Sequence, residues 1–133
     1  MEGEDGMVFT PFTFTIEKGK VREFAQAIGD LNPAYLNGEL VPPTFATVID
    51  MWGGLDFFEL VNLLELQPDK VLHGEQEYEY RGSFRVGQTV TVQAEVVSRQ
   101  VKAGLTFIKL QTTYLDEQGD VIMIGRSTII ERA

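Results

Sequence analysis

Few side chains in this sequence of 133 residues can transfer protons near neutral pH. The chain has no cysteine, which excludes thiol nucleophiles and thiolate metal sites, and it has a single histidine, His73. His73 is a candidate for general acid–base chemistry. Asp30 follows a predicted helix and has a structural interpretation, because an aspartate near a helix end often binds the backbone of a turn. With no second histidine to complete a recognisable ligand spacing, we expect no metal and no cofactor.

His73 begins a predicted strand and is followed by Gly74, where the backbone could approach a ligand closely. Side chains alternate between the two faces of a strand, so His73 falls with Glu75 and Glu77 on the polar face and Tyr78 falls on the other face. We therefore expect His73 to contact a partner or to form a structural hydrogen bond, with catalysis as the alternative.

The spacing of the apolar residues predicts one strand, then helices, then four strands. Strands carry apolar residues at every second position, and helices carry them at spacings of three and four. We expect strands at residues 10–16, 71–80, 88–101, 105–115 and 121–130, and helices at 19–29, from Thr44 onward and at 56–66. Residues 30–43 contain Asn-Pro, Asn-Gly and Pro-Pro pairs and should be mostly loop. Because tight turns join the later strands, this order predicts an α+β fold in which one long antiparallel sheet wraps around a central helix.

No repeat, low-complexity tract or linker interrupts the sequence, which predicts a single domain over residues 1–133 with residues 1–9 as a flexible acidic tail. The net charge of −9 argues against nucleic-acid binding, which depends on the neutralisation of phosphates. The acidic start is unlike a signal peptide, and no apolar run approaches the length of a membrane helix, about 20 residues. We expect a cytoplasmic protein that does not associate with membranes.

Three stretches occur in a characteristic order: FAQAIGDLNP at residues 24–33, VPPTF at 41–45 and LHGEQ at 72–76. With these stretches and this element order, the chain resembles the MaoC-like dehydratases, which have the hot-dog fold. The resemblance spans residues 13–131 and is strongest to the N-terminal-type half, as in the accessory subunit of mycobacterial-type (3R)-hydroxyacyl-ACP dehydratase. It implies action on 3-hydroxyacyl and 2-enoyl thioesters of coenzyme A or acyl carrier protein.

One position departs from the family pattern. Active hydratases of the family carry Gly-Asp-x-Asn-Pro-x-His, in which the aspartate and the histidine act together on a water molecule. Here Asp30 and Asn32 are present, but Tyr35 stands at the histidine position. A tyrosine with an ordinary pKa of about 10 cannot shuttle protons at neutral pH as an imidazole does. The resemblance therefore implies an accessory subunit that shapes the acyl site for a catalytic hot-dog partner.

The resemblance also implies where an acyl thioester would bind. Backbone amides at the helix start, at Thr44 and Phe45, would face the thioester oxygen, where negative charge develops. The apolar second helix would border a tunnel that begins near Thr44 and runs towards Phe58. The expected substrate-binding residues are Asn32, Tyr35, Thr44, Phe45, Gly74 and Phe58.

Other functions stay open at this point. The chain could be a catalytically competent homodimeric hydratase that uses Asp30 and His73, or a non-catalytic module that binds acyl thioesters. It could also be a hot-dog thioesterase with Asp50 or Glu59 as its carboxylate. Long unpaired edge strands are liabilities, so we expect either a homodimer or a heterodimer with a catalytic hot-dog subunit.

Overall fold

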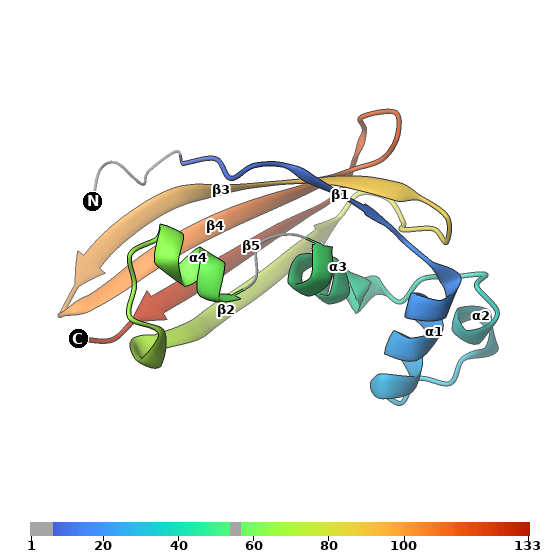
Figure 1. The fold of residues 1–133 in the computed structure, drawn as a ribbon, viewed down its shortest axis with the longest axis horizontal. Helices are drawn as coiled ribbons and strands as arrows, with labels where there is room; N and C mark the ends of the chain where they lie inside the picture. The colour runs from blue at the N-terminus through green and yellow to red at the C-terminus, as the bar shows by residue number, and fades with distance from the viewer. Residues whose placement is uncertain (1–6, 54–56) are drawn as a thin grey trace.

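The computed structural model describes residues 7–53 and 57–133 (Figure 1). Residues 1–6 of the expected tail, and residues 54–56, which include the expected start of the second long helix, lie outside the described residues. The elements in chain order are β1 (Phe12–Thr15), α1 (Lys18–Ala27), α2 (Pro33–Leu36), the 3₁₀ turn η2 (Pro43–Phe45), α3 (Ala46–Gly53), α4 (Phe57–Leu63), the 3₁₀ turn η3 (Pro68–Lys70), β2 (Val71–Tyr80), β3 (Thr89–Lys102), β4 (Leu105–Leu115) and β5 (Val121–Glu131). None of the helices in the described ranges is long and apolar enough to span a membrane.

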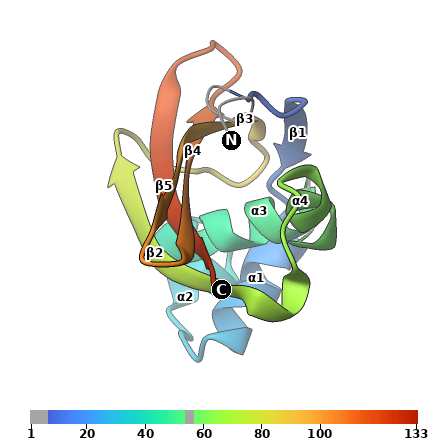
Figure 2. The same ribbon diagram turned by 90° about the vertical axis from the view of Figure 1, so that its left-hand side faces the viewer.

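The strands form one antiparallel sheet in the order β1-β3-β4-β5-β2. Figure 1 shows α3 and α4 on one face of this sheet, with α1 and α2 beyond one end of it. In the view turned by 90° about the vertical axis, the sheet curves around that helical layer from β2 to β1 (Figure 2). The prediction of an α+β fold, in which a long antiparallel sheet wraps around a central helix, is confirmed.

The segment Met7–Phe9 lies along β3 instead of extending as a tail. The amide of Phe9 donates a hydrogen bond of 2.9 Å to the carbonyl of Ala94, and the amide of Val96 donates one of 2.8 Å to Met7. The side chain of Phe9 is buried, with 7% of its surface exposed. The expectation of a flexible tail over residues 1–9 therefore needs correction at residues 7–9, because β3 offers them backbone partners and the core takes up the phenyl ring.

The segment before β2 differs from the prediction in two places. Residues 43–45 form the turn η2, so the α-helical part, α3, begins at Ala46 and not near Thr44. The predicted loop also contains the short helix α2. Its start is set by Asn32, whose Oδ1 accepts a hydrogen bond of 3.0 Å from the Ala34 amide, and by Pro33, which suits a first helical turn.

The core between the sheet and the helices is divided into two clusters, one around α3 and one around α4. The α3 cluster holds the buried residues Ile16, Val21, Phe45, Ala46, Ile49, Phe84, Val90, Val92, Tyr114, Ile122 and Met123. The α4 cluster holds Phe9, Val61, Leu64, Leu66, Val96, Ile108, Leu110 and Ile129. This division matters for function, because a cavity lined by residues of both clusters lies between the sheet and the helices.

Candidate functional site

Small side chains hollow the inner face of the sheet between the two clusters. Thr112 of β4 pairs with Ala94 of β3 on one side and with Gly125 of β5 on the other. Gly125 in turn pairs with Tyr78 of β2. Directly paired residues of antiparallel strands share a face of the sheet, so these four form one row across it. A Cβ on Gly125 would lie 3.4 Å from the ring of Tyr78, so the glycine lets this ring lie close against β5.

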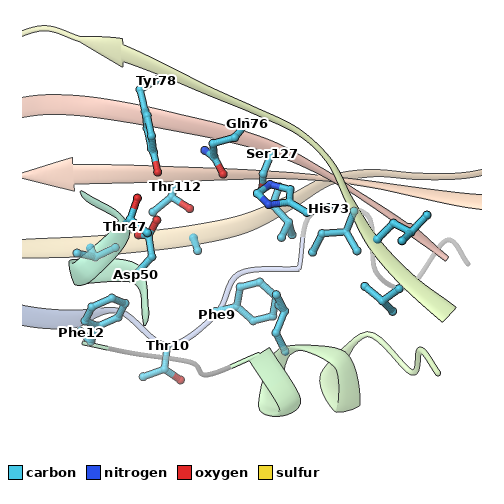
Figure 3. A pocket seen from close by; sticks show the side chains of 17 residues that line it. Phe9, Thr10, Phe12, Thr47, Asp50, His73, Gln76, Tyr78, Thr112 and Ser127 are labelled. Atoms are coloured by element: carbon cyan, nitrogen blue, oxygen red, sulfur yellow. The ribbon is translucent and has the colours of Figure 1, made fainter. Parts of the chain in front are cut away.

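This row forms part of the wall of a cavity of about 460 Å³ between the sheet and the helices α3 and α4 (Figure 3). The volume lies within the range of small-molecule sites, about 300–1,000 Å³, and such sites are mostly apolar with a few polar groups. The lining residues are Phe9, Thr10, Phe12, Thr47, Asp50, Leu60, Val71, Leu72, His73, Gln76, Tyr78, Val92, Ala94, Leu110, Thr112, Ser127 and Ile129.

Asp50 of α3 is the acidic residue of this lining, and it is hydrogen-bonded to Tyr114 of β4. The hydroxyl of Tyr114, whose side chain is fully buried, donates to Oδ1 of Asp50. Burial raises the pKa of Asp50 from its ordinary value of 3.8 to about 6, and the hydrogen bond from Tyr114 opposes part of this rise. Burial and the charge of Asp50 raise the pKa of Tyr114 in turn, so Tyr114 stays a hydrogen-bond donor at neutral pH.

Three more polar side chains lie around Asp50 (Figure 3). Thr47 precedes Asp50 by three residues on α3, so both share a helix face. Burial raises the pKa of Tyr78, a hydrogen bond with Thr47 lowers it, and the charges of Asp50 and of a neighbouring tyrosine add to the rise. Thr112 lies two residues before Tyr114 on the same face of β4. We call Asp50, Thr47, Tyr78 and Thr112 the polar cluster.

His73 faces the cavity and not the polar face of β2, which corrects the prediction from strand alternation. The pairing with β5 has a bulge between His73 and Glu75, so the inner face continues from His73 to Gln76. The residue within the bulge is Gly74, which does not line the cavity. A Cβ on Gly74 would lie 2.7 Å from Cδ1 of Ile130, so the glycine makes room for a side chain of β5.

Asp30, Asn32 and Tyr35 do not line the cavity. The exposed Asp30 accepts a hydrogen bond of 3.1 Å at Oδ1 from the Asn32 amide. Its side chain therefore binds the backbone of a turn, as the structural interpretation of this residue expects. Tyr35 is half-buried in α2. In Figure 1, α1 and α2 lie beyond the end of the sheet opposite to the start of β2, so one chain does not bring Asp30 and His73 together. Their catalytic role stays a prediction.

The residues expected along an acyl tunnel also lie outside the cavity lining. Thr44 is exposed, and Phe45 is fully buried in the α3 cluster. The amide of Phe45 donates a hydrogen bond of 2.9 Å to the carbonyl of Pro42, so it is not available to a thioester oxygen. On α4, Phe58 is 66% exposed, whereas Leu60 lines the cavity. The tunnel predicted from Thr44 to Phe58 is therefore wrong, and the structure has instead a cavity between the sheet and the helices α3 and α4.

Sequence reasoning missed most of the polar cluster. Asp50 entered only as a possible thioesterase carboxylate, and Thr47, Thr112 and Tyr114 were not singled out. A signal was present, because Asp50 is the one charged residue of the apolar helix ATVIDMWG and has Thr47 one turn before it. In residues 7–53 and 57–133, no group of three or more His, Cys, Asp or Glu side chains is arranged to hold a metal ion.

Comparison with known families gives one match over most of the chain. Residues 5–124 match the model of the FAS1-like dehydratase domain region. A UPF0336 protein from Streptomyces coelicolor is 28% identical over 130 aligned residues, which cover 90% of this chain and 86% of that protein. One from Saccharopolyspora erythraea is 26% identical over 129 residues, covering 90% of this chain and 82% of that protein.

Solved structures share the fold at lower identity. The C-terminally truncated HadBC (3R-hydroxyacyl-ACP dehydratase) complex from Mycobacterium tuberculosis contains a chain with a TM-score of 0.80 and 17% identity, and the match covers 96% of each chain. A MaoC-like dehydratase gives a TM-score of 0.85 at 20% identity, over 99% of this chain and 43% of that one. The (R)-hydratase of A. caviae gives 0.61 at 19% identity, over 98% and 97% of the two chains. These likenesses confirm the hot-dog fold, and together with the family model matched by residues 5–124 they bear out the resemblance to MaoC-like dehydratases.

Proposed function

Because the chain belongs to the family of FAS1-like dehydratase domain regions, we propose that it is the accessory, acyl-binding subunit of a hydro-lyase. The reaction would interconvert (3R)-hydroxyacyl and 2-enoyl thioesters of coenzyme A or acyl carrier protein. A catalytic hot-dog subunit would supply the aspartate and histidine that act on water, and this chain would hold the acyl group.

The cavity is the observation that carries this proposal. It measures about 460 Å³ and is lined mainly by aliphatic and aromatic side chains from α4 and from all five strands of the sheet. Burying apolar ligand surface against such a lining is favourable by about 25 cal/mol per Å². An acyl chain matches this lining, whereas a nucleotide or a sugar would leave most of its polar groups without partners.

The position of Asp30 supports an accessory role. In the family's active pattern, an aspartate and a histidine must reach one water molecule together. Asp30 is exposed and accepts a hydrogen bond from the Asn32 amide, and Tyr35 occupies the histidine position. Neither side chain faces the cavity. These two residues therefore offer no proton-transfer pair to a ligand held in the cavity.

The open edge of the sheet supports pairing with a second subunit. β2 is ten residues long; it has β5 on one side and, among residues 7–53 and 57–133, no strand on the other. Unpaired edges of this length favour association with another chain. Two residues that line the cavity from β2, His73 and Gln76, are exposed, so a partner on this edge would lie beside the cavity. The HadBC and ChsH1-ChsH2 structures from Mycobacterium tuberculosis are both complexes, which agrees with a heterodimer.

The test is a hydratase assay on 2-enoyl thioesters of short and long chain length. The chain would be assayed alone and with a hot-dog protein that carries the intact Gly-Asp-x-Asn-Pro-x-His stretch. We expect turnover only from the pair. Ala94→Phe, which fills the cavity, should lower turnover of the long substrate selectively, whereas Gln93→Phe, on the opposite face of β3, should not. Turnover by the isolated chain that survives Asp30→Asn would contradict the proposal.

One observation favours a second candidate function, acyl-thioester hydrolysis. The carboxyl group of Asp50 lies in the cavity with a pKa raised by burial to about 6, which is close to the value that suits a general base at neutral pH. Hydrolysis of acyl-CoA by the isolated chain, lost in Asp50→Asn, would support this function. A wild-type chain that binds acyl-CoA without hydrolysing it would exclude it.

A further inference from the structure

The polar cluster lies in a cavity that is otherwise lined mainly by apolar side chains, with Thr10, His73, Gln76 and Ser127 as the other polar residues of the lining. A plain aliphatic chain would bury these polar side chains without forming any hydrogen bond with them, and burial of that kind costs free energy. Within residues 7–53 and 57–133, the structure gives the cluster two side-chain hydrogen bonds, from Tyr114 to Oδ1 of Asp50 and between Thr47 and Tyr78. Oδ2 of Asp50 and the hydroxyl of Thr112 have no hydrogen-bond partner among these described residues.

The chemistry of these two free groups limits what can bind between them. An ionised carboxylate only accepts hydrogen bonds, whereas a threonine hydroxyl can donate or accept. A ketone or an ether oxygen only accepts, so it would oppose the charge of Asp50. A hydroxyl group donates and accepts at once, so it can donate to Oδ2 of Asp50 while it accepts from Thr112. A hydroxyl also carries no charge, which suits a half-buried position.

Apolar residues lie on both sides of the polar cluster. Phe12 and Val92 belong to the part of the wall that packs with the α3 cluster, and Leu110 and Ile129 belong to the α4 cluster. In Figure 3 the polar cluster is gathered on α3 and the neighbouring strands, whereas α4 lies on the far side of the cavity. A ligand that fills the cavity therefore has carbon chain on both sides of the group that meets Asp50.

We infer that the polar cluster binds a hydroxyl group carried partway along the acyl chain, beyond the carbons that react. The ligand of the cavity is then a hydroxylated acyl chain and not a plain aliphatic one. This inference rests on the proposed function, because it takes the cavity as the acyl site. It adds a specificity that the hydration reaction itself does not require.

Calorimetric titration of the isolated chain tests this inference. Stearoyl-CoA would be compared with a set of hydroxystearoyl-CoA positional isomers, below the concentration at which micelles form. All probes share the same coenzyme, so a difference in affinity reports the hydroxyl alone. A hydrogen bond to a charged group contributes about tenfold in affinity, so at least one isomer with the hydroxyl beyond the third carbon should bind about tenfold more tightly than stearoyl-CoA.

Two variants locate the effect. Asp50→Asn removes the charge and keeps the size, and Thr112→Val removes one hydroxyl; within each variant, the ratio of the affinities for the hydroxylated and the plain probe should fall to within about threefold. Asp69→Asn changes the charge by the same amount on the exposed turn η3 and should keep the full preference. Equal affinity for all probes, or a preference that survives both cavity variants, would overturn the inference and leave the acyl-binding function standing. Failure of every acyl-CoA to bind would overturn both.

Discussion

The carboxyl group of Asp50 should destabilise the folded chain at neutral pH. Burial raises its pKa from 3.8 to about 6, so the folded state holds the proton more tightly than the unfolded state does. The stabilising effect of the protonated form is fully present below about pH 3.8 and is lost as the pH rises through about 6. Between these limits the free energy of unfolding falls by about 3 kcal/mol.

Asp50→Asn tests this directly, because asparagine has nearly the size of the neutral acid and does not ionise. The pKa of about 6 already includes the opposing effect of the hydrogen bond from Tyr114, so the variant can recover at most about 3 kcal/mol. We expect the free energy of unfolding to rise by about 1–3 kcal/mol at about pH 7.5 and to differ little from wild type at about pH 4.

Urea denaturation at both pH values would measure the difference, with Asp69→Asn as the matched control. Asp69 is exposed on η3 and outside the cavity, so removal of its charge should change stability by less than about 0.5 kcal/mol. If Asp50→Asn lowers stability at neutral pH, or if its effect is the same at both pH values, then burial of a charged carboxyl group is the wrong explanation.

Two further predictions distinguish cavity residues from their neighbours. Leu60→Ala should weaken binding of a long-chain acyl-CoA in a titration, because Leu60 lines the cavity, whereas Phe58→Ala on the exposed side of α4 should leave it nearly unchanged; equal losses would contradict this assignment. Gly74→Ala should lower the free energy of unfolding by about 1 kcal/mol, because the new Cβ displaces the end of the Ile130 side chain, without a change in acyl affinity; an altered affinity at unchanged stability would instead indicate that Gly74 contacts the ligand.

Most of the sheet could be predicted from the sequence, because the strands carry a local signal. β2 and β4 have the predicted bounds, β3 differs from them by one residue at each end, and β5 is longer by one residue at its end. Alternation of apolar and polar residues is a property of a short segment, so it can be recognised without knowledge of the strand's neighbours. The helix α2 was missed because the pairs around Asn32 and Pro33 favour turns and helix starts alike.

The site could not be predicted in the same way, because it depends on pairing between distant segments. Thr112 and Gly125 are unremarkable in sequence and form part of one wall only through the register of β4 with β5. His73 was placed on the wrong face because alternation assumes an uninterrupted strand, whereas the bulge at Gly74 shifts it. The expected substrate residues came from a resemblance, and none of them lines the cavity.

The polar residues of the cavity break the inward apolar pattern at neighbouring positions of several strands. Gln76 pairs with Ser127, which pairs with Leu110, and the adjacent row joins Tyr78 to Thr112 through Gly125. Polar substitutions that arose by chance would be scattered along the strands. Each of them would weaken the packing of the core without a compensating interaction. Here the polar residues of the strands lie next to one another and opposite Asp50 of α3, in the cavity between the two core clusters. Departures from a stable packing pattern that converge on one place are typical of a binding site, where a ligand replaces the missing contacts. Occupancy of the cavity should therefore stabilise the fold, and the ligand that stabilises it most is the one whose polar group meets Asp50.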